Sequence, residues 1–152
     1  MRFITKMLSA VALCILASGC TVNATSSGQM EDKQAAEDLA NDLYSALSEN
    51  NYPAAEKLFG EKFFAVTPKD SLRMMFTRTR ETLGEFESNT LVNSETRDIM
   101  GTNSHTDYVV VYNIEYSKHK AVETITMLKE DGEEKPKIVG YNVQSDGFLK
   151  WN

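Results

Sequence analysis

The pattern of apolar residues changes once along this chain, near residue 84. Before that point, apolar side chains recur every three or four residues, which is the spacing of one helix face. After it, they alternate with polar residues in runs rich in Val, Ile and Tyr, which is typical of strands with one buried face. Helices followed by consecutive strands predict an α+β domain in which the helices cover one face of a sheet.

Two helices are expected before residue 60. The first covers residues 30–48, where one stripe of apolar side chains recurs at helical spacing: Ala36, Leu39, Ala40, Leu43 and Leu47. The second starts at Pro53, because proline suits the first position of a helix, and it ends near Gly60.

The third helix has the clearest start and stop signals. Thr67 is expected to cap it, with Pro68 at the first helical position and Asp70 as the acidic residue of a capping box. Leu72, Met75, Phe76 and Leu83 then form its apolar stripe. Gly84 is a natural stop, because glycine adopts the left-handed conformation that commonly ends a helix.

Four strands follow, and the turns between the last three are short. The expected strands cover residues 85–98, 107–117, 121–130 and 137–145. Asp131-Gly132 is a hairpin signal between the last two. Short turns predict an antiparallel meander. The sequence therefore predicts a single α+β domain over residues 30–152, with three N-terminal helices packed on a mainly antiparallel four-stranded sheet.

Three short stretches in this order resemble the nuclear-transport-factor-2-like superfamily, and most of all its small bacterial lipoprotein branches of unknown function. They are residues 51–55 (NYPAA), the Leu83-Gly84 helix end, and residues 137–141 (KIVGY). The resemblance covers about residues 30–146. It implies a cystatin-like cone, in which a curved sheet wraps around the helices and leaves a pocket. Members use the pocket for isomerisation, dehydration, ligand binding or assembly, so the fold alone does not fix the function.

The first twenty residues predict an export signal that ends in a lipidation site. Arg2 and Lys6 are positive, and residues 7–16 form an uncharged core about half as long as a transmembrane helix needs. Residues 17–20 (ASGC) resemble the lipobox of bacterial lipoproteins, in which the cysteine is lipidated and becomes the new N-terminus. The alternatives are an ordinary cleaved signal or an uncleaved anchor, with Cys20 incidental.

Lipidation would leave the mature chain without a thiol. Cys14 is discarded with the signal peptide at residues 1–19, and Cys20 carries the lipid, which excludes disulfides, thiol nucleophiles and thiolate metal sites. Residues 20–29 are small and polar, and they predict a flexible tether. The lipobox resemblance implies a palmitate-bearing protein of the bacterial cell envelope. Because Thr21 and not Asp follows the cysteine, it implies the outer membrane, facing the periplasm, if the cell has two membranes.

The charge of the mature chain excludes nucleic acid as a partner. Removal of Arg2 and Lys6 leaves 14 basic residues against 22 acidic ones, a net charge of −8. Nucleic-acid binding requires a basic surface, and this chain has the opposite balance. Anionic lipid would also repel it, so the expected contact with the membrane is through the lipid on Cys20.

Glu123 is the first candidate for acid–base chemistry, with Tyr112 as a donor. If Ile125 and Met127 face the core, strand alternation turns Glu123 the same way. Tyr108, Tyr112 and Tyr116 share one face of the preceding strand and could supply phenol donors. The simpler interpretation makes Glu123 a solvated residue, or one paired with Lys or Arg, and makes the tyrosines packing residues.

Asp107 is a further catalytic candidate, because it lies two residues after His105 and could form a dyad with it. His105 and His119 otherwise appear as exposed turn residues, and neither has a second ligand at metal-binding spacing. No phosphate loop or nucleophile elbow is present in the sequence, so no metal or cofactor is expected.

The remaining candidates are charged or apolar surface groups. Arg73, Arg78 and Arg80 form a basic cluster on the third helix, which is either a solvated face, a partner for an inward carboxylate or an anion site. Three large apolar residues stand at the C-terminus: Phe148, Leu149 and Trp151. They either fold back onto the sheet or form a docking surface for a partner.

Because no convergent catalytic set is evident, the leading hypothesis is a lipid-anchored envelope protein. Its domain would bind a partner protein or a small apolar ligand without catalysis. One alternative is a pocket enzyme of the isomerase or dehydratase kind, carried by Glu123 with tyrosine donors. The other is a purely structural homodimer.

Overall fold

The computed structural model describes residues 24–150, and the predictions for Cys20 and Trp151 lie outside this range. The helices are α1 (Ala24–Ser48), α2 (Tyr52–Glu56), α3 (Glu61–Phe64) and α4 (Lys69–Leu83). The strands are β1 (Phe86–Ile99), β2 (His105–Tyr116), β3 (Lys120–Glu130) and β4 (Lys137–Gln144), and the short 3-10 helix η1 (Asp146–Lys150) follows them. The predicted α+β class is confirmed.

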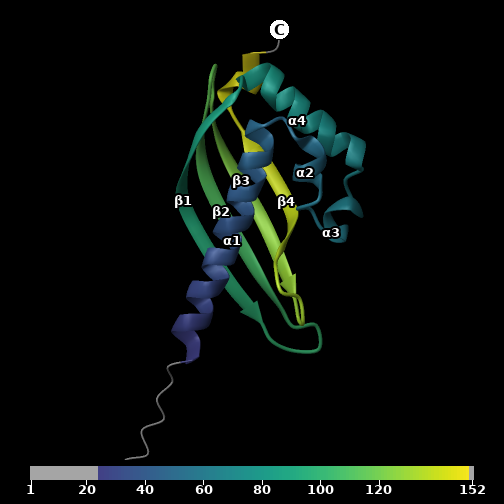
Figure 1. The fold of residues 1–152 in the computed structure, drawn as a ribbon, viewed down its shortest axis with the longest axis vertical. Helices are drawn as coiled ribbons and strands as arrows, with labels where there is room; N and C mark the ends of the chain where they lie inside the picture. Colours follow the sequence, from purple (N-terminus) through teal and green to yellow (C-terminus); the bar gives the residue numbers. More distant parts are fainter. Residues whose placement is uncertain (1–23, 151–152) are drawn as a thin grey trace, which may run out of the picture.

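The four strands form one antiparallel sheet in the order β1-β2-β3-β4. The sheet is curved, and α1 lies along its hollow side, while α4 crosses near the end where the chain terminates (Figure 1). This arrangement agrees with the cone that the resemblance implies. The space between sheet and helices is the hydrophobic core.

Alternation along the two central strands puts one set of side chains into that core. On β2 the buried residues are every second one from Tyr108 to Tyr116, and on β3 they are Ala121, Glu123, Ile125 and Met127. From the other side, α1 contributes Ala36, Ala40, Leu43 and Tyr44. Because the period of two holds along both strands and Ile125 and Met127 face the core, Glu123 faces it too, as that condition predicts.

A bulge in β4 breaks the same alternation. Met127 pairs with Ile138, but the next residue back along β3, Thr126, pairs with Gly140, so β4 carries one extra residue at this point. Ile138 and Tyr141 are three apart and would face opposite sides of a regular strand. With the bulge, both turn inward: Ile138 is fully buried, and the Tyr141 ring lies 5.9 Å from that of Phe76.

The helix boundaries differ from the prediction in two places. The first helix starts earlier than residue 30, at Ala24, so it includes residues assigned to the tether. The second predicted helix is shorter than expected, because α2 ends at Glu56, and α3 is an additional single turn that was not predicted. Helix ends and single-turn helices depend on tertiary contacts more than on the local sequence pattern.

The start of α4 corrects the predicted cap. Pro68 occupies the N-cap position itself, and no side chain caps this helix, so the assignment of Thr67 as the cap is wrong by one residue. The predicted stop is confirmed, because Gly84 ends the helix with φ at 98°. A Cβ at Gly84 would overlap the side chain of Ser117, so the α4–β1 junction depends on glycine here.

Two ionic clusters fix the helices to the rest of the fold. Glu56 on α2 contacts Lys69 at 3.0 Å and Arg73 at 2.7 Å on α4. Asp32 on α1 accepts hydrogen bonds from Lys129 at 2.7 Å and from Tyr108 at 3.1 Å, which ties this helix to β3 and β2. Within residues 24–150, no helix is both long and apolar enough to cross a membrane.

Candidate functional site

Glu123 is the one carboxylic acid among the described residues whose side chain is wholly inside the core, with 0% exposure. The hydroxyl of Tyr116 donates a 2.6 Å hydrogen bond to Oε1, and that of Tyr141 donates a 2.7 Å hydrogen bond to Oε2. Both oxygens therefore have a phenol donor. The simpler interpretation of Glu123, as a solvated or Lys/Arg-paired residue, is wrong.

Burial controls the protonation of this acid. Removal from water raises the pKa of Glu123, and the hydrogen bonds from Tyr116 and Tyr141 partly oppose that rise, because they stabilise the carboxylate. The same burial, together with the nearby carboxylate, raises the pKa of both tyrosines. They therefore remain protonated donors over the physiological range.

Tyr44 adds a third hydroxyl to this cluster. Its side chain is 2% exposed, and its hydroxyl has no hydrogen-bond partner within residues 24–150. It lies near enough to Glu123 to affect the pKa of that carboxyl. The Tyr44 ring stacks on Phe86 at 5.4 Å and meets Tyr112 edge-on at 5.3 Å. These contacts hold the ring in place although its hydroxyl is unsatisfied.

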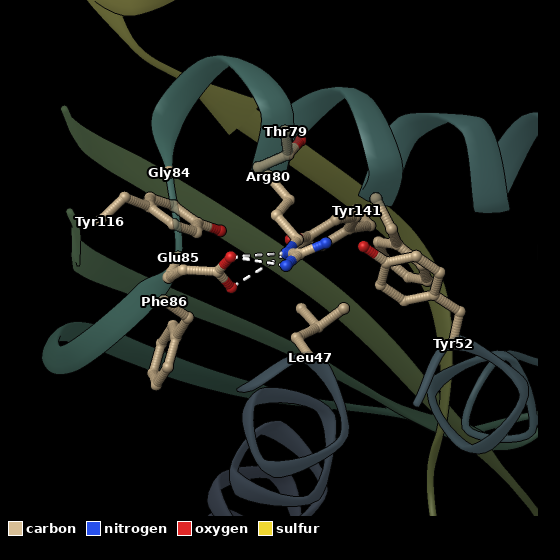
Figure 2. Close-up of a pocket in the computed structure, with 10 residues that line it drawn as sticks. Leu47, Tyr52, Thr79, Arg80, Gly84, Glu85, Phe86, Tyr116 and Tyr141 are labelled. Carbon is tan, nitrogen blue, oxygen red and sulfur yellow. Dashed lines mark hydrogen bonds and ion pairs between the residues drawn. The ribbon is translucent and has the colours of Figure 1, made fainter. Parts of the chain in front are cut away.

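A small cavity adjoins the two tyrosine donors (Figure 2). Its volume is about 20 Å³. That is room for roughly one water molecule, since a water needs about 10–15 Å³ by this measure. Tyr116 and Tyr141 line it, but Glu123 does not. A substrate of even a few heavy atoms would need the surrounding side chains to move.

An ion pair lines the solvent side of the cavity. Arg80 on α4 donates to both carboxylate oxygens of Glu85, with Nη2 at 2.6 Å from Oε1. Figure 2 shows the Arg80 side chain extending between Glu85 on one side and Tyr141 and Tyr52 on the other. Both partners are about half-exposed. The pair therefore lies between the cavity and solvent.

The other catalytic candidates lie apart from this cluster. Tyr112 is buried directly opposite Glu123 in the strand register, but its hydroxyl makes no hydrogen bond with a described residue. Asp107 is on the outer face of β2, with its carboxylate 3.6 Å from Nε2 of His105. The predicted neighbours are thus in contact, but outside the cone. His105 and His119 are half-buried, which corrects their assignment as exposed turn residues.

The arginine cluster does not reach the buried acid. Arg73 bonds to Glu56 and Arg80 bonds to Glu85, so both are occupied by carboxylates other than Glu123. The hydrogen bond from Lys69 holds the pKa of Glu56 below its ordinary value, although partial burial opposes this, and Arg73 adds to the lowering. The prediction that one of these arginines could neutralise an inward carboxylate finds no support in these contacts.

Sequence reasoning missed Tyr141 and Tyr44. Alternation from Ile138 places Tyr141 on the outer face, and only the bulge reverses it. Tyr44 follows Leu43 on α1, beside the predicted apolar stripe. Only Tyr44 could have been predicted from the sequence, because helical spacing places residues 36, 40, 43, 44 and 47 on one wide apolar face.

A larger hollow lies at the end of the sheet where β2 and β4 finish and β3 begins. We call it the C-terminal groove, and its volume is about 740 Å³. The predicted interaction residues Phe148 and Leu149 both line it. Phe148 packs partly against the core, whereas Leu149 is 80% exposed. Phe148 therefore packs back onto the domain, whereas the side chain of Leu149 faces solvent.

Within the described part of the chain, no three His, Cys, Asp or Glu side chains are placed to hold a metal ion. No family model matches the sequence, and neither does any curated protein. A solved structure from Novosphingobium aromaticivorans, named as a predicted aromatic ring hydroxylase, matches at a TM-score of 0.49 with 16% identity. The match covers 76% of this chain and 94% of that one, and it carries no conclusion about activity here.

Proposed function

We propose that this chain is a lipid-anchored cell-envelope protein whose cone-shaped domain binds a partner protein without catalysis. The observation that carries the proposal is that side chains fill the interior of the cone. Both oxygens of Glu123 accept hydrogen bonds from buried tyrosines, and the adjoining cavity of about 20 Å³ holds roughly one water.

A filled cone argues against the other form of the binding hypothesis, a small apolar ligand held inside. Ligand pockets for small molecules usually measure about 300–1,000 Å³. The aromatic side chains of Tyr44, Phe76 and Phe86 occupy the space between helices and sheet instead. Binding on the outer surface needs no such opening, and the C-terminal groove offers about 740 Å³ there.

The lipid anchor rests on the order of charge, apolar core, small residues and Cys20 in the sequence. Cys20→Ser should move the protein from the membrane to the soluble fraction after cell fractionation, with its folded domain intact by circular dichroism. The matched control is Cys14→Ser, which changes the other cysteine and should leave the protein in the membrane. A Cys20→Ser protein that stays in the membrane would refute the anchor.

Partner binding can be tested in intact cells with the full chain. A photo-crosslinking amino acid is placed at Val122, in the C-terminal groove, and separately at Val66, which is 81% exposed elsewhere. We expect one discrete adduct from position 122 and none from position 66. Crosslinks to lipid alone, or no adduct from several further surface positions, would refute the binding function.

A pocket enzyme of the isomerase or dehydratase kind is the second candidate, because Glu123 is a buried acid with a raised pKa and two donors. Motion of the Arg80–Glu85 pair could admit a substrate to the tyrosine hydroxyls. Such a site would exchange α-protons of enolisable ketones with deuterated water, and Glu123→Gln would abolish the exchange. A panel of ketones that exchanges no faster than in buffer would exclude this candidate.

A further inference from the structure

Half of the residues that line the C-terminal groove are apolar, although the groove opens to solvent. Six aliphatic or aromatic residues contribute to it: Ile114, Ala121, Val122, Val143, Phe148 and Leu149. Val122 and Leu149 are 40% and 80% exposed. Apolar side chains gathered in one exposed hollow, unlike single ones scattered over a surface, are typical of an interaction site.

Three charged residues line the groove, and two of them pair with each other. Glu115 and Lys120 form a 2.7 Å ion pair on its rim and neutralise each other. Asp146 is the remaining charged lining residue, and no described side chain pairs with it. An occupant that brings an apolar group for the lining and a cation for Asp146 therefore fits the groove in both respects.

The groove lies at the end of the molecule opposite the start of α1 (Figure 1). Helix α1 has 25 residues, which corresponds to about 37 Å at 1.5 Å per residue. A lipid attached before α1 would hold that end at the bilayer and direct the groove away from it. The occupant is then a protein beyond the membrane surface and not the membrane itself.

A second copy of the chain is disfavoured by charge. Each mature chain would carry a net charge of −8, so two copies repel each other, and both would present a negative groove. A basic partner would be attracted by the same charges. We propose, on the basis of the proposed binding function, that the C-terminal groove binds a partner protein that inserts an apolar side chain next to a Lys or Arg.

The probe for this proposal is a displayed library of random peptides, selected on the full lipidated chain in phospholipid nanodiscs. The selected peptides should share an aromatic or aliphatic residue within about two positions of Lys or Arg. One such peptide is then synthesised, and its affinity is measured by fluorescence polarisation. Val122→Asp should weaken binding at least tenfold, and Val66→Asp, which places the same charge on a distant exposed valine, should not.

Asp146→Asn tests the charge separately. It should weaken binding about two- to fivefold, because an exposed ion pair contributes only a few tenths of a kcal/mol to about 1 kcal/mol, and it should reduce the salt dependence. Peptides without a basic residue, or binding unaffected by Val122→Asp, would refute the proposal.

The other occupants give distinct results that also refute it. A wild-type dimer in nanodiscs that Val122→Asp converts to a monomer would identify a second copy. Peptide binding that appears only in Trp151→Ala would identify the chain's own C-terminus. If the photo-crosslinked partner instead maps to another surface, the binding function stands and only the assignment to this groove fails.

Discussion

The hydroxyl of Tyr141 donates a 2.7 Å hydrogen bond to Oε2 of Glu123 across the β3–β4 pair. The two residues are diagonal neighbours, since Glu123 pairs with Val143, and a tyrosine side chain spans that separation. With Tyr116 on the other oxygen, this bond allows a carboxyl group to be buried without a cation. A buried acid that is fully hydrogen-bonded costs far less than an unpaired one.

Glu123→Gln should change how stability depends on pH. Because burial raises the pKa of Glu123 above 4.5, the folded protein holds a proton that the unfolded chain releases. The stability contributed by this group is complete below pH 4.5 and falls as pH rises toward the folded-state pKa, by up to about 1.4 kcal/mol per pH unit. Urea unfolding of wild type and variant should therefore give a free-energy difference that shifts in favour of the variant over this range. Glu87→Gln, on the exposed part of β1, is the control; equal slopes in wild type and Glu123→Gln would contradict the prediction.

Tyr141→Phe should destabilise the fold by about 1–3 kcal/mol, because Oε2 of Glu123 loses its donor while remaining buried. Tyr112→Phe is the matched control, since Tyr112 is the direct register partner of Glu123 but makes no hydrogen bond with a described residue. Its expected cost is below about 1 kcal/mol. Chemical denaturation measures both. In a Glu123→Leu background the cost of Tyr141→Phe should shrink, and an unchanged cost would show that the bond is not its cause.

Glu56→Gln should weaken the connection between α2 and α4 at neutral pH. Because Lys69 and Arg73 lower the pKa of Glu56, its contribution to stability is present above pH 4.5 and is lost as pH falls through the folded-state pKa. Glu56→Gln should be less stable than wild type at pH 7, and the stabilities of the two proteins should become equal at acidic pH. Thermal unfolding across pH tests this, with Asp42→Asn on the exposed face of α1 as control. A difference that persists at low pH would mean that packing, not the ion pair, is responsible.

Gly84→Ala should be much more destabilising than Gly132→Ala. Both glycines have positive φ, 98° and 84°, so an alanine is strained at either site by about 1–3 kcal/mol. At Gly132 the added Cβ meets nothing within 4 Å, whereas at Gly84 it would lie 2.9 Å from the backbone nitrogen of Lys118. The difference between the two melting temperatures isolates this overlap. An equal decrease in melting temperature for Gly84→Ala and Gly132→Ala would show that the α4–β1 junction accommodates the added Cβ without a loss of stability.

The apolar pattern of the sequence by itself determined the order of helices and strands and the faces of β2 and β3. Strand alternation places Glu123 on the same face as Ile125 and Met127, and the structure shows that this face is the buried one. The helix stop at Gly84 follows in the same way from local backbone preference.

Only the tertiary structure decided what surrounds Glu123. The bulge in β4 reverses the direction of Tyr141, and Tyr44 approaches from a helix nearly eighty residues earlier in the chain. The volume of the cone likewise depends on how aromatic rings from α1, α4 and β1 pack together. Local periodicity fixes the direction of each side chain, but contacts between distant segments determine its partner and the space left beside it.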